Sequence, residues 1–167
     1  MFISCGAETA KHFSKQELTA ALSALTANRT YAPAAGDAYI FYASTVALGD
    51  TVNFVLAITA GTADLADLVS CTVQVNGENI SGSFSEFMDT TVNGKPAKMI
   101  LIKGVPASQI GAPLTFTVMN GDAAVSAILT YSVNAYCART FDGGESGEQY
   151  VIRALYRLGV AAQNYLA

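Results

Sequence analysis

Residues 51–59 read Thr-Val-Asn-Phe-Val-Leu-Ala-Ile-Thr, and this stretch predicts the fold of the chain. Apolar side chains recur at every second position from Val52 to Ile58, so an extended backbone places them on one face, with Asn53 on the other. Further short β-rich runs occupy residues 38–44, 68–75, 79–84, 87–92, 97–103, 114–119 and 124–131. Period-2 runs at such regular spacing predict an all-β sandwich or barrel.

The turns between these runs indicate antiparallel pairing. Asn-Gly occurs at residues 76–77, 93–94 and 120–121, each time between apolar-rich runs. A type I′ hairpin turn needs positive φ at both central residues, and Asn-Gly meets that need best. We therefore expect three hairpins.

Helical patterns flank the β-rich region. Ser14, followed three residues later by Glu17, is a capping-box pattern that predicts a helix start in the segment 1–30. Residues 31–36 contain Pro33 and Gly36 and are expected to form a linker, and residues 37–132 a β-sandwich. A short helix from Val133 and a final helix over about 148–166 are predicted to pack on the sandwich as a C-terminal hairpin spanning 133–167. The predicted buried stripe of the last helix comprises Val151, Leu155, Leu158, Ala162 and Tyr165, with Ile152 and Leu166 widening it.

Composition excludes several function classes. Hydrophobic residues are 51% of the 167-residue chain, charged residues are 13%, and the net charge is −4. Only 9 Lys and Arg residues are present, so we expect neither nucleic-acid binding nor docking on anionic lipid. No apolar run reaches the roughly 18 residues that span a bilayer, so no membrane insertion is expected. No signal peptide is visible, so the protein either stays inside the cell or was cut from a longer secreted chain.

No catalytic, metal or cofactor site is predicted. His12 is the sole histidine and lies in the N-terminal helical segment. A glycosidase-type pair among Glu78, Glu86 and Asp89 is weighed and disfavoured, because these residues flank predicted hairpin turns. The acidic loop with Asp142, Glu145 and Glu148 lacks the EF-hand pattern and is interpreted as a helix N-terminus rather than a calcium site. The cysteines Cys5, Cys71 and Cys137 are interpreted as small buried hydrophobes, with one disulfide plus a free thiol as the alternative.

The two ends of the chain have similar sequence patterns, and several segments of the chain resemble a known group of proteins. Residues 5–13 and 158–166 are both small-residue helical patterns with an early glycine, which suggests one period of a tandem array. Residues 131–139 and 154–165, with the segments 92–96 and 103–111, resemble modules of large secreted surface proteins of anaerobic, often gut, Firmicutes. The resemblance implies an Ig-like sandwich-plus-helix module at the cell surface. It transfers no site residue, and no activity is settled for such modules.

The functional expectation is a non-catalytic structural, adhesion or protein-interaction module, with surface proteins, glycans or neighbouring modules as partners. A carbohydrate-binding accessory module is the alternative, and a small hydrolase a more distant one. Tyr39, Phe41 and Tyr42 follow one another closely in one predicted strand, so aromatic rings leave both of its faces. They are the candidate ligand-facing residues, although helices covering one face would leave them no such role.

Overall fold

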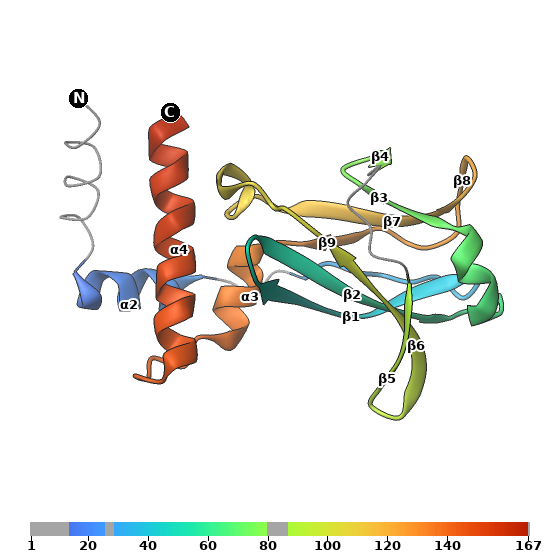
Figure 1. Cartoon of the computed structure of the whole chain (residues 1–167), viewed down its shortest axis with the longest axis horizontal. Helices are drawn as coiled ribbons and strands as arrows, with labels where there is room; N and C mark the ends of the chain where they lie inside the picture. The colour runs from blue at the N-terminus through green and yellow to red at the C-terminus, as the bar shows by residue number, and fades with distance from the viewer. Residues whose placement is uncertain (1–13, 26–28, 80–86, 167) are drawn as a thin grey trace. The chain divides into compact units, whose positions relative to one another are not determined.

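A computed structural model describes residues 14–25, 29–79 and 87–166 (Figure 1). The chain divides into two compact units. The β unit holds the described residues of 29–106 and 113–131, and the helical unit holds those of 14–28, 107–112 and 132–166. Residues 107–112 thus belong to the helical unit although they interrupt the β unit in sequence.

The first sheet of the β unit has the order β1-β2-β6-β5, with every pairing antiparallel. Its strands are β1 (Tyr39–Leu48), β2 (Val52–Ala60), β5 (Met88–Val92) and β6 (Lys95–Ile102). The alternation in residues 51–59 is confirmed, because Phe54, Leu56 and Ile58 are each no more than 1% exposed. Burial of each of these side chains contributes roughly 1.5–3 kcal/mol. A slip of one residue would move all of them to the other face, so their burial determines the register of the sheet.

The second sheet completes an Ig-like sandwich. Its order is β4-β3-β7-β8, and β9 also pairs with β7. The strands are β3 (Thr72–Val75), β4 (Glu78–Asn79), β7 (Leu114–Asn120), β8 (Ala123–Ala124) and β9 (Leu129–Tyr131). In Ig lettering the first sheet has the order A-B-E-D, and the second sheet places C next to F. The predicted mainly β, Ig-like fold with helices is confirmed.

The core lies between the two sheets. Phe54 on β2 meets Phe116 on β7 edge to face, with ring centroids 5.3 Å apart and planes at 66°. Phe54 also meets Tyr131 on β9 at 5.9 Å. Edge-to-face pairs add about 0.5–1.5 kcal/mol beyond the area they bury, so this cluster holds the sheets together.

Two of the three predicted turns are confirmed. Asn76-Gly77 and Asn93-Gly94 have positive φ at both residues, 52° and 79° in the first and 51° and 76° in the second. In the third, the turn residues are Gly121 and Asp122, because Asn120 still pairs with Ala123. Gly121 has a φ of 60°, which suits the first central position of a type II′ turn. The chain turns one residue later than the Asn-Gly pattern predicts.

Two predicted strands are wrong in part. Leu65–Ser70 forms the 3-10 helix η1, so only Thr72–Val75 of the run 68–75 is a strand. Asp64 caps η1 by accepting a hydrogen bond from the Ala66 N–H at 2.9 Å, a local alternative to the sheet ladder. The run 124–131 is interrupted between β8 and β9.

The helical unit contains α2 (Lys15–Ala24), η2 (Ala107–Gln109), α3 (Val133–Thr140) and α4 (Gly147–Leu166). The Ser14–Glu17 capping box is confirmed in both directions. Gly159 of α4 lies against Ile110, which follows η2 and is fully buried. These contacts tie residues 107–112 to the final helix.

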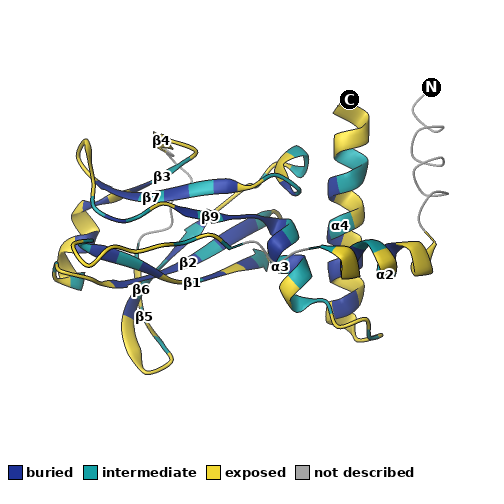
Figure 2. Cartoon of the chain, turned by 180° about the vertical axis from the view of Figure 1, so that it is seen from behind, coloured by how far each residue is buried: buried dark blue, intermediate teal, exposed yellow. Residues whose placement is uncertain are grey.

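The predicted stripe of α4 is correct at Ile152 and Leu155 and wrong at its other large apolar positions. Leu155 is 5% exposed, but Leu158 is 48% and Tyr165 is 72% exposed. Besides Ile152 and Leu155, the buried positions comprise Gln149, Arg153 and Gly159, which the pattern did not predict. Figure 2 shows this mixture of buried and exposed turns along α4. Gly159 lies on the inner face of α4 and leaves room for Ile110. The buried side of the helix therefore differs in part from the one that the pattern of apolar residues predicts.

Candidate binding face

Of the three candidate aromatic residues, only Tyr42 reaches the surface. Tyr39 is 3% and Phe41 is 1% exposed, whereas Tyr42 is 36% exposed. The register pairs Phe41 with Ile58 and Ala43 with Ala57, which leaves Tyr42 as the extra residue of a β-bulge. A bulge inserts one residue and redirects a side chain, and here it sends Tyr42 outward.

The buried aromatics of this region have structural partners. The Tyr39 hydroxyl donates to the Asp64 carbonyl at 3.2 Å, and the Phe41 N–H donates to the Tyr31 hydroxyl at 2.9 Å. Arg29 donates to the Phe41 carbonyl at 3.0 Å. Burial is the main cause that raises the pKa of Tyr31 and of Tyr39 above 10. These side chains cover the edge of β1 at Phe41 rather than offering a ligand platform.

The register of the first sheet defines an outer face. Leu56 pairs with Ile100 toward the core, so the alternate pairs, such as Val55 with Leu101, turn to the opposite side. We call this side the outer face. It comprises Ile40, Tyr42, Ala43, Thr45, Ala47, Asn53, Val55, Ala57, Thr59, Met88, Thr90, Val92, Lys95, Ala97, Met99 and Leu101.

The outer face is apolar and only partly buried. Met88 is 45% exposed, and Val55, Met99 and Leu101 are half-buried, whereas Ala57, Thr59 and Ala97 on the same face are buried. Lys95 is the one charged residue of the outer face. No residue of this face carries a carboxylate, although the chain contains 13 Asp and Glu residues. An apolar sheet face that remains accessible is typical of a contact surface.

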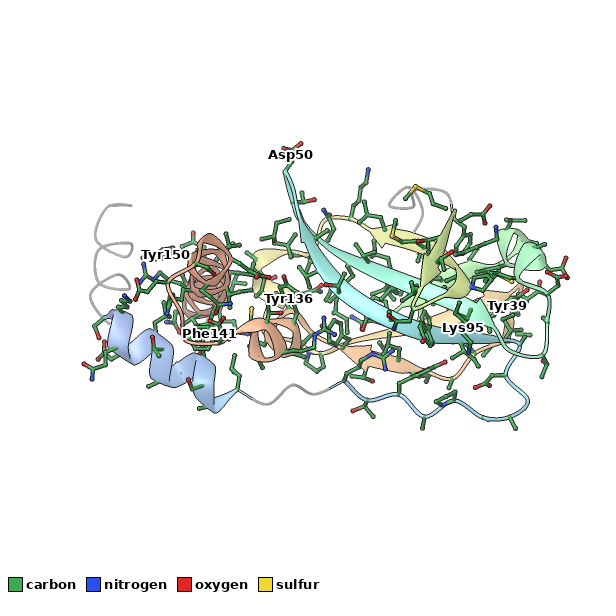
Figure 3. All side chains as sticks on the ribbon, turned by 90° about the horizontal axis from the view of Figure 1, so that it is seen from below. Tyr39, Asp50, Lys95, Tyr136, Phe141 and Tyr150 are labelled. Carbon is green, nitrogen blue, oxygen red and sulfur yellow. The ribbon has the colours of Figure 1, made fainter. Side chains whose placement is uncertain are left out.

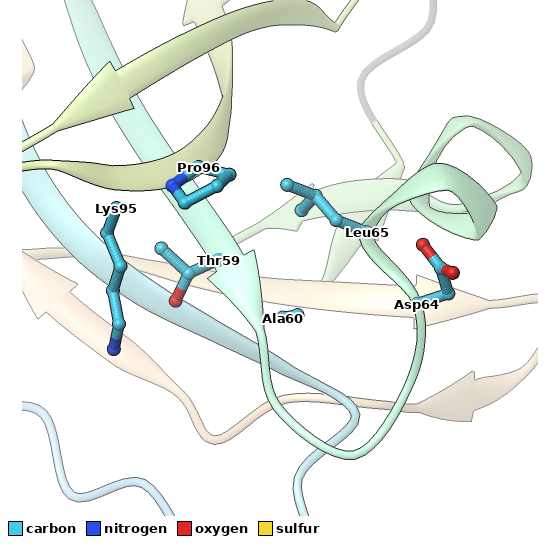
Figure 4. A pocket seen from close by; sticks show the side chains of 6 residues that line it. All are labelled: Thr59, Ala60, Asp64, Leu65, Lys95 and Pro96. Carbon is cyan, nitrogen blue, oxygen red and sulfur yellow. The ribbon is translucent and has the colours of Figure 1, made fainter.

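A cavity of about 430 Å³ opens beside this face, where β2 ends and β6 begins. Figure 4 shows its lining, which consists of Thr59, Ala60, Asp64, Leu65, Lys95 and Pro96. The Lys95 ammonium lies 5.3 Å from the centroid of the Tyr42 ring, a cation–π contact. Thr59 is 2% exposed, and its Oγ1 has no hydrogen-bond partner among the residues that the structure describes. Mostly apolar walls with a few polar groups are the usual composition of a ligand pocket.

The acidic loop before α4 is held by structural contacts. The Asp142 carboxylate accepts the Gly144 N–H at 2.7 Å, and Glu145 accepts the Tyr150 hydroxyl at 2.8 Å and pairs with Lys15. The hydrogen bond from Lys15 is the main cause that lowers the pKa of Glu145. Among residues 14–25, 29–79 and 87–166, no group of three or more His, Cys, Asp or Glu could hold a metal ion.

Arg153 holds this loop in place. It is only 5% exposed, and its guanidinium carbon lies 5.2 Å from the Phe141 ring and 5.9 Å from the Tyr150 ring. Its Nη2 donates to the Gly143 carbonyl at 3.4 Å. Phe141 and Tyr150 are labelled in Figure 3. A second cavity, of about 300 Å³, adjoins Phe141 and Gly143 and is also lined by α2 residues.

The remaining candidate residues do not come together. His12, Cys5 and Glu86 lie outside the described residues. Glu78 stands on β4 and Asp89 on β5, which belong to different sheets, and Asp89 pairs with Lys98 at 2.5 Å.

The two described cysteines are buried free thiols. Cys71 and Cys137 are both free and both buried, as expected for small hydrophobes. Burial raises the pKa of Cys137 to about 12, so this thiol is neutral near pH 7.

Sequence reasoning identified Tyr42 but missed Lys95 and the cavity. The signal for the bulge was present, because Phe41 and Val46 are both apolar but lie an odd number of positions apart. Only an inserted residue lets both face the core. No local pattern indicates that Lys95 lies across β2 from Tyr42.

Comparison with known proteins finds no family model that matches the chain, no match among curated proteins and no match among solved structures. Within the described residues, no helix is long and apolar enough to cross a membrane.

Proposed function

We propose that the chain is a non-catalytic interaction module of a secreted or cell-surface bacterial protein and that it contacts its partner through the outer face. The observation that carries this proposal is the accessible apolar sheet face with Lys95 as its one charge. Soluble domains rarely leave a broad apolar patch without a use. The surface location rests on the resemblance of residues 131–139 and 154–165 to surface-protein modules.

A carbohydrate-binding module is the second candidate, and Tyr42 favours it. The ring is partly exposed and lies beside the Lys95 ammonium and near a cavity that is lined in part by Thr59. Sugars stack on exposed aromatic rings and hydrogen-bond to neighbouring polar groups. The many apolar residues around Tyr42 fit a protein surface better, so this reading stands second.

The first experiment compares two exposed positions of the β unit. Met88 lies on the outer face and is 45% exposed, whereas Val69 lies on η1 and is 65% exposed. We expect binding to immobilised extracellular-matrix proteins and mucins, measured by biolayer interferometry, to fall at least tenfold in Met88→Asp. Binding should stay unchanged in Val69→Asp. Equal loss in both variants would count against the outer face.

Three further measurements separate the alternatives. Glycan-array binding that disappears in Tyr42→Ala, without any protein binding, would favour the carbohydrate reading. Turnover of generic ester or glycoside substrates would overturn the non-catalytic role. Fractionation of the producing cells should find the native product outside the cytoplasm, and a purely cytosolic product would refute the proposed location.

A further inference from the structure

We infer that the cavity beside Lys95 takes an aliphatic side chain of an extended partner segment, and that a carboxylate next to that side chain pairs with the Lys95 ammonium. This inference rests on the proposed function and names the partner's chemistry. It joins three observations, which are the charge at the rim, the apolar walls and the unpartnered hydroxyl of Thr59.

Lys95 determines the local charge. Among the described residues it forms no ion pair, and its ammonium contacts the Tyr42 ring. Charges farther away than about 8 Å are largely screened at physiological salt, so distant acids do not cancel it. Asp50, for example, lies at the tip of the β1–β2 hairpin, at the other end of the sheet (Figure 3). A partner that docks here meets a positive group at the Lys95 end of the cavity and a carboxylate, Asp64, at the other end.

The lining itself places the partner's carboxylate on the Lys95 side. In Figure 4 the Asp64 carboxylate lies beyond Leu65, at the opposite end of the cavity from Lys95. Asp64 already accepts the Ala66 N–H at 2.9 Å and would repel an incoming carboxylate. The partner's negative group therefore has one favourable position, beside Lys95.

The walls select an apolar anchor. Ala60, Leu65 and Pro96 are the apolar residues of the lining, and a cavity of about 430 Å³ accommodates one aliphatic side chain with room for its backbone. Binding energy at protein interfaces concentrates on such anchors in desolvated pockets. A sugar would meet few hydrogen-bonding groups here, so the lining favours a peptide.

Thr59 supplies the remaining polar contact. Its Oγ1 is buried and lacks a partner within the described part of the chain, and a buried hydroxyl without a hydrogen bond carries a desolvation cost. A backbone N–H or C=O of an extended segment is the group that accompanies every anchor side chain. Its hydrogen bond with Thr59 would remove that cost and fix the orientation of the segment.

Synthetic peptides test the charge. The probe is acetyl-Thr-Asp-Leu-Thr-Val-amide, with matched peptides in which Asn or Lys replaces Asp or Gly replaces Leu. Binding is measured on the full chain by NMR titration, following the resonances of Thr59 and Leu65. We expect the Asp peptide to bind up to about fivefold tighter than the Asn peptide, the upper end of the range for an exposed ion pair. The Lys and Gly peptides should bind more weakly still.

Matched lysine variants locate the effect. The preference for Asp should vanish in Lys95→Ala and persist in Lys103→Ala, which removes the same charge just beyond the far end of β6. Three results would overturn the inference. They are loss of the preference for Asp in both variants, equal binding of the Asp and Asn peptides, and no peptide binding at millimolar concentration.

Two outcomes overturn the inference, and the second of them leaves the proposed function standing. Glucuronic acid that shifts Thr59 and Leu65, while the peptides do not, would replace the peptide with an acidic sugar. A partner whose binding fails in Met88→Asp but is unaffected by Lys95→Ala would keep the outer face as the interface. In that case only the Lys95 cavity would be excluded.

Discussion

Replacing Gly159 with alanine tests the contact that decides how α4 packs. Alanine in a helix interior is favoured over glycine by about 1 kcal/mol, so helix propensity alone predicts a more stable protein. The structure predicts the reverse. A Cβ at position 159 would lie 2.8 Å from Cγ2 and 3.1 Å from Cβ of Ile110, and Ile110 is fully buried and has no free space to enter.

The two effects can be weighed against each other. Overpacking of a core costs typically 1–3 kcal/mol, which exceeds the gain in propensity. We expect Gly159→Ala to lower the free energy of unfolding by about 1 kcal/mol and at most about 2 kcal/mol. For a chain of this size, each kcal/mol corresponds to roughly 2–4 °C in Tm.

A double-mutant cycle isolates the clash. Ile110→Ala alone should cost about 2–5 kcal/mol, because it empties a buried site. In that background the contact is gone, so Gly159→Ala should become stabilising by up to about 1 kcal/mol. Urea denaturation followed by circular dichroism at 222 nm measures all four chains.

The control is a second glycine of the same helix. Gly147 opens α4, and a Cβ there would meet nothing within 4 Å, so Gly147→Ala should change stability little. A rise in Tm for Gly159→Ala in the presence of Ile110, or additivity across the cycle, would refute the packing described here.

Three other predictions concern single groups. Leu155→Ala should cost about 2–5 kcal/mol, whereas Leu158→Ala, at a side chain that is 48% exposed, should cost less than about 1 kcal/mol; similar urea midpoints for both would contradict the register of α4. The Cys137 thiol should resist iodoacetamide at pH 8 in the folded chain and react after urea is added, because burial raises its pKa to about 12; rapid labelling of the native protein, read by peptide mass spectrometry, would be inconsistent with that burial. The folded-state pKa of Glu145 lies below its ordinary value of 4.5, so its contribution to stability is present above that value and is lost as the pH falls through the lower folded value. Carboxyl NMR titration should show this pKa rise in Lys15→Ala, and an unchanged titration would exclude the ion pair.

The sequence predicted the features that short segments specify by themselves. The alternation in residues 51–59 forms a strand because each side chain's face depends only on the extended backbone. The Ser14–Glu17 capping box and the Asn76-Gly77 turn form because both partners lie within a few residues of each other. These local rules sufficed for the Ig-like class and for the helical ends.

Tertiary structure alone decided which surfaces became core and which became the candidate site. Leu158 looks like a core residue in the helical pattern, but α4 buries Gly159 instead, because Ile110 arrives from a distant segment. The bulge turns Tyr42 outward while Phe41 stays inside, and only the pairing of β1, β2 and β6 brings Lys95 beside the Tyr42 ring. A strand or helix face acquires its packing partner only when segments that are far apart in sequence come together. The local periodicity of the sequence does not say which segments those are.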